Sequence, residues 1–107
     1  MFMRLEHYSE KKLKKQVKEI VGRYLDLKKY KIFFFGSRVK GSKYLANDRS
    51  DIDVGIEGPE AVPAEIMLNI EEEISNIIIL YRIDIVDFRD VSEDFYKVAK
   101  QNIEIIK

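Results

Sequence analysis

The stretch IFFFGSRVKGSKYLANDRSDIDVGI, residues 32–56, decides the fold of this 107-residue chain. It begins with an unbroken apolar run that Gly36 ends, and such a run is typical of a strand buried on both faces. Near its end acidic and apolar residues alternate, so a strand there would carry Asp51 and Asp53 on one side and apolar side chains on the other. The stretch therefore predicts two strands joined by a polar, basic loop.

Helical and strand periods alternate on both sides of this stretch. Apolar residues recur every three or four positions over residues 8–29 and again after Pro63, which predicts two amphipathic helices. Residues 82–88 alternate as a third strand, Ser92 can cap a short last helix, and residues 103–105 can form an edge strand. The predicted fold class is α+β, with a small mixed β-sheet of three to four strands packed on helices.

Composition limits the class of protein. The chain is 46% apolar and 36% charged, with 19 basic and 19 acidic residues, and a chain of this length builds one core, so we expect a single domain over residues 1–107. The absence of cysteine excludes disulfides, thiolate metal sites and cysteine nucleophiles. Neither a secretory signal nor an apolar run of roughly 18 residues is found, so we expect a cytoplasmic protein without a membrane contact.

Three acidic side chains are candidate ligands for divalent cations. On one face of a strand, Asp51 and Asp53 would have Cα atoms roughly 7 Å apart, close enough to hold one or two hard ions. Asp84 interrupts an apolar strand, where a carboxylate is costly unless it is paired, bound to metal or at the exposed end of the strand. The alternative is that these are solvated structural acids. Asp87, on the opposite face beside a turn, is assigned a structural role.

Gly36 and Ser37 follow the first strand directly and are candidates for binding phosphate. Glycine allows close approach to the backbone, a serine hydroxyl and the N–H groups that open a helix can hold phosphate oxygens, and Arg38 and Lys40 add positive charge. The Walker A spacing is not met, which argues against a P-loop. The alternative is an ordinary turn capped by Ser37.

The order of these motifs resembles that of the minimal nucleotidyltransferases in the DNA polymerase β-like superfamily. Their signature is a Gly-Ser, a short helix, an Asp-x-Asp strand and a later Asp on a neighbouring strand, matched here by GSRVKG, DID and RIDIVDF. The similarity extends over about residues 10–105 and implies the nucleotidyltransferase fold. One departure is the spacing between Ser37 and Asp51, thirteen residues where the family usually has about ten, a difference that a surface loop tolerates.

The resemblance implies transfer of a nucleoside monophosphate, AMP from ATP, to a hydroxyl group. Asp51 and Asp53 would hold two Mg²⁺, Asp84 would join one metal and help to deprotonate the acceptor, and Ser37 would grip the β and γ phosphates with the backbone beside Gly36. Short members of the family work beside a HEPN-type protein as the antitoxin half of a pair. We therefore expect ATP or another NTP as substrate and a HEPN-type partner as acceptor, in a homodimer or hetero-oligomer, without direct binding to nucleic acid.

Two other functions stay open at this stage. One is a binding module that neutralises its partner by contact alone, in which the three acids are retained without a catalytic role. The other is a hydrolase with Asp51 as nucleophile, although the remaining phosphate-binding residues of haloacid dehalogenases have no match and the chain is short for that core. Tyr44 is a candidate for stacking on the base or packing on a helix. His7 has no second ligand nearby and is assigned no role, and the lysines between residues 11 and 18 are assigned to a solvated helix face.

Overall fold

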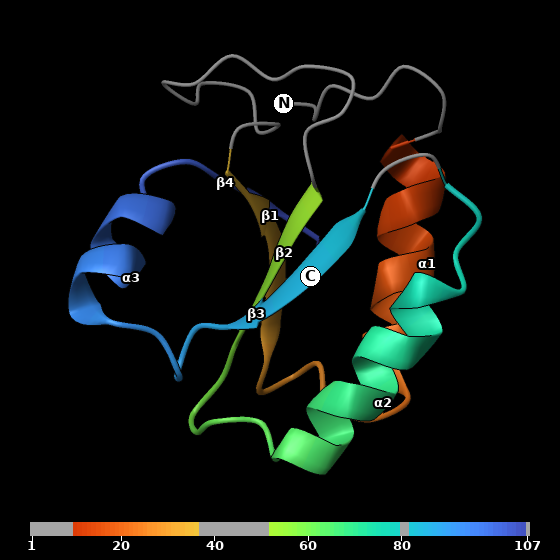
Figure 1. Ribbon diagram of the computed structural model, residues 1–107, viewed down its shortest axis with the longest axis horizontal. Coiled ribbons are helices and arrows are strands. Elements are labelled where there is room, and N and C mark those ends of the chain that lie inside the picture. Colours follow the sequence, from red (N-terminus) through yellow and green to blue (C-terminus); the bar gives the residue numbers. More distant parts are fainter. Residues whose placement is uncertain (1–9, 37–51, 80–81, 107) are drawn as a thin grey trace.

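The computed structural model describes residues 10–36, 52–79 and 82–106 (Figure 1). Its elements in chain order are α1 (Glu10–Gly22), β1 (Lys31–Phe35), β2 (Ile52–Glu57), α2 (Ala64–Ser75), β3 (Ile83–Asp87), α3 (Glu93–Ala99) and β4 (Ile103–Ile105). The strands form one sheet in the order β3-β2-β1-β4, in which β1 is antiparallel to both β2 and β4 while β2 and β3 are parallel. The predicted α+β class with a small mixed sheet is confirmed.

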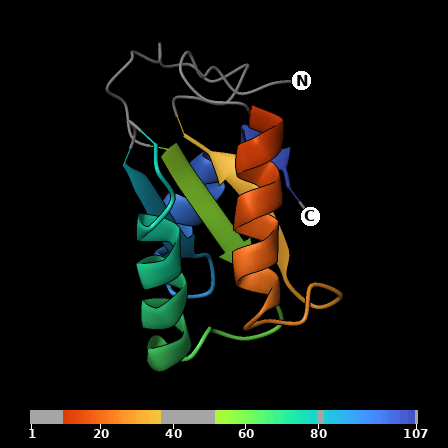
Figure 2. The same ribbon diagram turned by 90° about the vertical axis from the view of Figure 1, so that its right-hand side faces the viewer.

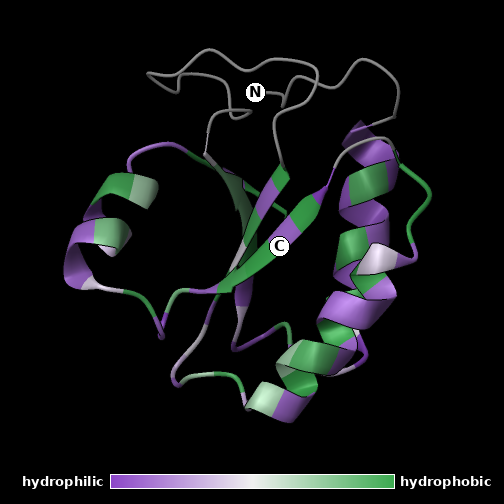
Figure 3. Cartoon of the chain, in the orientation of Figure 1, coloured by the Kyte–Doolittle hydropathy of each residue, from purple (hydrophilic) through white to green (hydrophobic). Residues whose placement is uncertain are grey.

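Helices lie on both faces of this sheet (Figures 1 and 2). Helices α1 and α2 cover one face side by side, and α3 lies on the other. Figure 3 shows apolar and polar residues alternating along α1 and α2, as expected of amphipathic helices. None of the described helices has the length and apolar composition required to cross a lipid bilayer.

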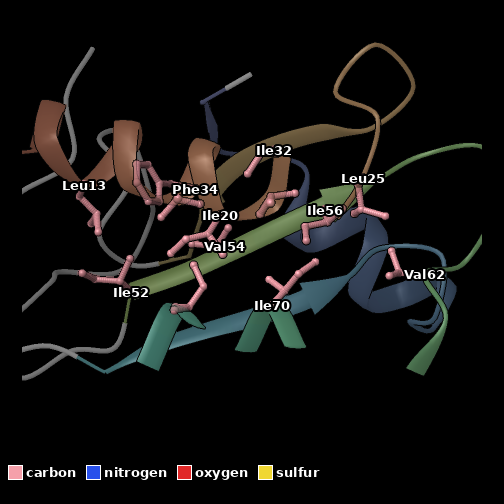
Figure 4. Packing of buried hydrophobic residues seen from close by; sticks show 13 residues of the cluster. Leu13, Ile20, Leu25, Ile32, Phe34, Ile52, Val54, Ile56, Val62 and Ile70 are labelled. Atoms are coloured by element: carbon pink, nitrogen blue, oxygen red, sulfur yellow. The ribbon is translucent and has the colours of Figure 1, made fainter. Parts of the chain in front are cut away.

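The main core fills the space between the sheet and the pair α1 and α2 (Figure 4). Every second residue of β2 enters it, as the alternation in the sequence predicts. Its buried members are Leu13, Val17, Ile20, Val21, Leu25, Ile32, Phe34, Ile52, Val54, Ile56, Val62, Ile70 and Ile74. The remaining residues of β2 therefore face α3, and these include Asp53.

A smaller aromatic core lies on the α3 face of the sheet. Its buried members are Phe33, Phe35 and Phe88, against which Tyr96 and Ala99 of α3 pack. The rings of Phe33 and Phe88 meet edge to face with centroids 4.8 Å apart. This layer supports the middle of the sheet, between the two polar ends described below.

Helix α1 is shorter than predicted. The apolar period continues to Lys29, but the helix ends at Gly22 and a series of turns follows, in which the side chain of Asp26 accepts a hydrogen bond of 2.9 Å from the N–H of Lys28. Glycine is a weak helix former, whereas Leu25 stays buried in the core through the turns. The apolar period therefore indicates which side chains are buried, and it continues past the residue at which the helix ends.

The other predicted elements agree with the structure. Helix α2 starts after Pro63, as predicted, and ends at Ser75; residues 77–79 belong to no helix or strand. Ser92 caps α3, because its hydroxyl accepts a hydrogen bond of 3.1 Å from the N–H of Phe95. Strand β4 pairs with β1 at the edge of the sheet, as expected for residues 103–105.

Candidate active site

Asp53 and Asp84 are neighbours on the parallel strands β2 and β3. The register of the two strands pairs them directly, which places their Cα atoms roughly 5 Å apart. Both side chains leave the α3 face of the sheet and are half-buried, because Ile52 and Ile83 beside them turn to the main core. The structure therefore brings together two of the three predicted acids, while Asp51 lies outside the described residues.

Gly36 ends β1 directly beside this pair. Its φ angle is +86°, a conformation that favours glycine, and a Cβ atom at this position would lie 2.4 Å from Oδ2 of Asp53. The missing side chain therefore leaves room for the carboxylate. The predicted role of Gly36 in binding phosphate stays a prediction, and its expected partners Ser37, Arg38 and Lys40 lie outside the described residues, as do Tyr44 and His7.

Arg82 is a neighbour of the site that the sequence interpretation missed. Its Nε lies 3.1 Å from Oδ1 of Asp84, and the two side chains are 77% and 36% exposed, so water screens the ion pair. The sequence could have indicated this neighbour, because Arg82 and Asp84 are two residues apart and side chains two apart on a strand share a face. Asp84 is therefore a paired carboxylate at the start of its strand, one of the conditions under which a charge in an apolar run is tolerated.

The described acids fit a divalent cation such as Mg²⁺. Carboxylate oxygens are its preferred ligands, and Mg²⁺ is usually held by one or two carboxylates together with water and substrate phosphates. Asp53 and Asp84 supply two carboxylates, and Gly36 leaves space beside the first. Within residues 10–36, 52–79 and 82–106 no cluster of three potential ligands from His, Cys, Asp and Glu forms, and the third predicted ligand, Asp51, lies outside these ranges.

Asp87 holds the far end of β3 in place, as its predicted structural role requires. It is buried, and its two carboxylate oxygens accept hydrogen bonds from the backbone N–H groups of Val62, at 2.7 Å, and Arg89, at 2.9 Å. The first of these bonds ties β3 to the segment that leads into α2. The strand that carries Asp84 is thus fixed at the end remote from the site.

A buried acidic group under α1 was also missed by the sequence interpretation. Glu104 of β4 lies 2.7 Å from Nζ of Lys14, which also contacts Glu10 at 3.0 Å. Burial and a hydrogen bond with Glu10 raise the pKa of Glu104. Glu104 faces α1 and not α3, so it stands on the opposite side of the sheet from Asp53 and Asp84.

Comparison with known proteins gives one family and several structural neighbours. The family described as "Polymerase beta, Nucleotidyltransferase" matches residues 15–107. A curated relative, the probable protein adenylyltransferase MntA of Haemophilus influenzae, is 31% identical over 78 residues, which cover 73% of this chain and 66% of the relative. The chain thus spans just under two thirds of that protein's length.

The solved structures share the fold at low sequence identity. A mutant of the MntA–HpeT toxin–antitoxin has a TM-score of 0.69 at 14% identity, covering 88% of this chain and 72% of that chain. A tri-AMPylated Shewanella oneidensis HEPN toxin in complex with its MNT antitoxin gives 0.66 at 15% identity, covering 89% and 69%. A toxin–antitoxin with AMP-PNP gives 0.69 at 16% identity, covering 88% and 72%. These matches confirm the predicted nucleotidyltransferase fold.

Proposed function

The chain belongs to the polymerase beta nucleotidyltransferase family, and on this basis we propose that it transfers AMP from ATP to a hydroxyl group of a protein partner. The observation that carries the proposal is the pairing of Asp53 with Asp84 on adjacent strands beside Gly36. This is where the family's signature requires two of its acids to meet.

The proposed reaction is an in-line displacement at the α-phosphorus of ATP. The acceptor oxygen forms a bond to phosphorus, the bond to the leaving pyrophosphate breaks, and the carboxylate of Asp84 takes the hydroxyl proton. Gly36 and Ser37 bind the β and γ phosphates, with Arg38 and Lys40 as counter-charges. Asp51, Asp53 and Asp84 would hold two Mg²⁺, which when bound neutralise phosphate charge and lower the pKa of the acceptor hydroxyl.

The acceptor in this proposal is a hydroxyl of a HEPN-type toxin, and the chain is the antitoxin half of the pair. Two findings support this choice: the relative from H. influenzae is named a protein adenylyltransferase, and one structural neighbour is a complex with a tri-AMPylated HEPN toxin. A hollow of about 360 Å³ beside β3 and the end of α2 is lined in part by Arg82 and Asp84, so it adjoins one of the two paired acids. The proposed place of action is the cytoplasm, where ATP is available.

Label transfer tests this function. The chain is incubated with labelled ATP, Mg²⁺ and the product of the adjacent open reading frame, and label on that product is measured. We expect Asp53→Asn and Asp84→Asn to abolish metal-dependent labelling, and Asp94→Asn, an exposed change on α3, to retain it. If the wild-type chain neutralises the partner without labelling it, or Asp53→Asn leaves labelling intact, the proposal is wrong and neutralisation by contact takes its place.

A further inference from the structure

A second polar hollow lies at the opposite end of the sheet from the paired acids. It has a volume of about 470 Å³, and its charged and aromatic lining consists of Lys29, Lys31, Glu57, Arg89, Tyr96 and Lys100. Glu57 and Asp53 share a face of β2 but are four residues apart, which is roughly 13 Å along the strand. The hollow is therefore separate from the site that holds Asp53 and Asp84.

Positive charge dominates this hollow. Four cationic side chains converge on it from three places in the chain: the approach to β1, the turn after β3 and the end of α3. Glu57 is the one acidic residue among the described residues that line it, and both its carboxylate oxygens are already bound, one by Nζ of Lys100 at 2.6 Å and the other by the hydroxyl of Tyr96. Lys29 and Lys31 are exposed and form no ion pair with any acid that the structure describes.

Two of the four cations are held in position before any ligand binds. Nζ of Lys100 is fixed by Glu57 and lies 5.1 Å from the centroid of the Phe33 ring. Nε of Arg89 donates a hydrogen bond of 2.5 Å to the carbonyl of Gly58, which anchors its guanidinium at the rim. A ligand that meets pre-positioned charges loses less free energy to ordering them than one that meets mobile side chains.

We propose that this hollow binds the phosphate groups of a small molecule. Its volume falls within the range of about 300–1,000 Å³ usual for small-ligand sites. Phosphate concentrates negative charge and acceptor oxygens in a small volume, and arginine and lysine together are its usual protein ligands. The phosphate groups have two sources, free pyrophosphate or a nucleotide, and the test below distinguishes them.

The test is an amide NMR titration of the full chain with pyrophosphate, with AMP and with malonate, in the absence of Mg²⁺ and at low salt. We expect saturable shifts at the amides of Lys31, Gly58 and Lys100 with pyrophosphate or AMP, and none with malonate. The tighter of the two binders identifies the source. The same shifts should persist in Asp53→Asn, which separates this site from the proposed transfer site.

Charge removal then tests the lining itself. Lys29→Ala combined with Lys31→Ala should weaken binding about tenfold, because two unpaired cations are lost. The matched control combines Lys11→Ala with Lys15→Ala, which removes the same charge from the exposed face of α1 and should leave the affinity unchanged. The proposal is overturned if these amides do not saturate, if malonate or an acidic peptide binds equally well, or if the control pair weakens binding as much.

Discussion

Replacing Gly55 by alanine should destabilise the fold strongly, because β2 has no room for a side chain at this position. A Cβ atom there would lie 2.4 Å from Cε2 of Phe33 and 2.6 Å from Cε1 of Phe88, about 1 Å closer than the 3.4 Å at which ordinary contact begins. Both rings are buried, at 0% and 2% exposure, and they pack edge to face on each other. Neither ring can move aside without disturbing the other.

The expected cost follows from this overlap. Overpacking of a well-filled core costs typically about 1–3 kcal/mol, and two blocked rings place Gly55→Ala at the upper end, about 3 kcal/mol. A domain of this size has a free energy of unfolding of about 5–15 kcal/mol, so the variant still folds. With a urea slope of about 2 kcal/mol per molar, the midpoint of unfolding should fall by about 1.5 M.

Urea unfolding followed by circular dichroism measures this change. The control is Gly22→Ala at the exposed end of α1, where the nearest atom to a new Cβ is Cδ1 of the flexible Leu27 side chain at 3.1 Å, and where alanine should be neutral or stabilise slightly. In Gly55→Ala, a further change of Phe88→Leu should cost less than it does in the wild-type chain, because it relieves the overlap. A midpoint for Gly55→Ala within about 0.3 M of the wild type would refute the reasoning.

Three further changes test the site and its supports. Gly36→Ala should abolish transfer while the unfolding free energy falls by only about 1–2 kcal/mol, since the new methyl group presses on the carboxylate of Asp53 at a positive φ; unchanged labelling would contradict this. The pKa of Glu57 is lowered below its ordinary value of 4.5, because burial, which raises it, is outweighed by hydrogen bonds from Lys100 and Tyr96. The stability that Glu57 contributes is therefore complete above pH 4.5 and is lost as the pH falls through the lowered pKa, so urea midpoints of the wild type and Glu57→Gln should converge on acidification; a constant gap down to pH 3 would argue against this. Ser92→Ala should lower the unfolding free energy by about 1 kcal/mol through loss of the cap on α3, whereas Ser92→Asp should keep it, and thermal unfolding of both variants measures the difference.

The paired acids could be predicted from the sequence because strand alternation fixes which side chains share a face. Asp53 and Asp84 each stand between apolar residues that face the main core, so both must leave the other face. The resemblance to a known signature then supplied what alternation cannot, the register that makes them neighbours. The roles of Ser37, Arg38 and Asp51 stay predictions, since these residues lie outside the described part of the chain.

The features that the sequence did not reveal depend on contacts between distant segments. The hydrogen bonds that join Glu57 to Tyr96 and Lys100 link residues about forty positions apart in the sequence, so no local apolar pattern predicts them. The premature end of α1 was missed for the opposite reason, since apolar residues such as Leu25 stay buried after the helix has ended. Apolar periodicity indicates which side chains are buried. It predicts the end of a helix only where burial of the side chains stops at the same residue as the helical backbone.

The placement of β3 gives the site a weak point of its own. Among the strands that the structure describes, β3 pairs with β2 alone, and most of its residues are half-buried, whereas β1 has partners on both sides. Fraying of β3 would separate Asp84 from Asp53, while the fully buried core residues of α1, β1 and β2 would stay packed on one another. On warming, the proposed transfer activity should therefore disappear before the protein unfolds, and a partner that binds along β3 should protect that activity from heat without contacting Asp53 or Asp84.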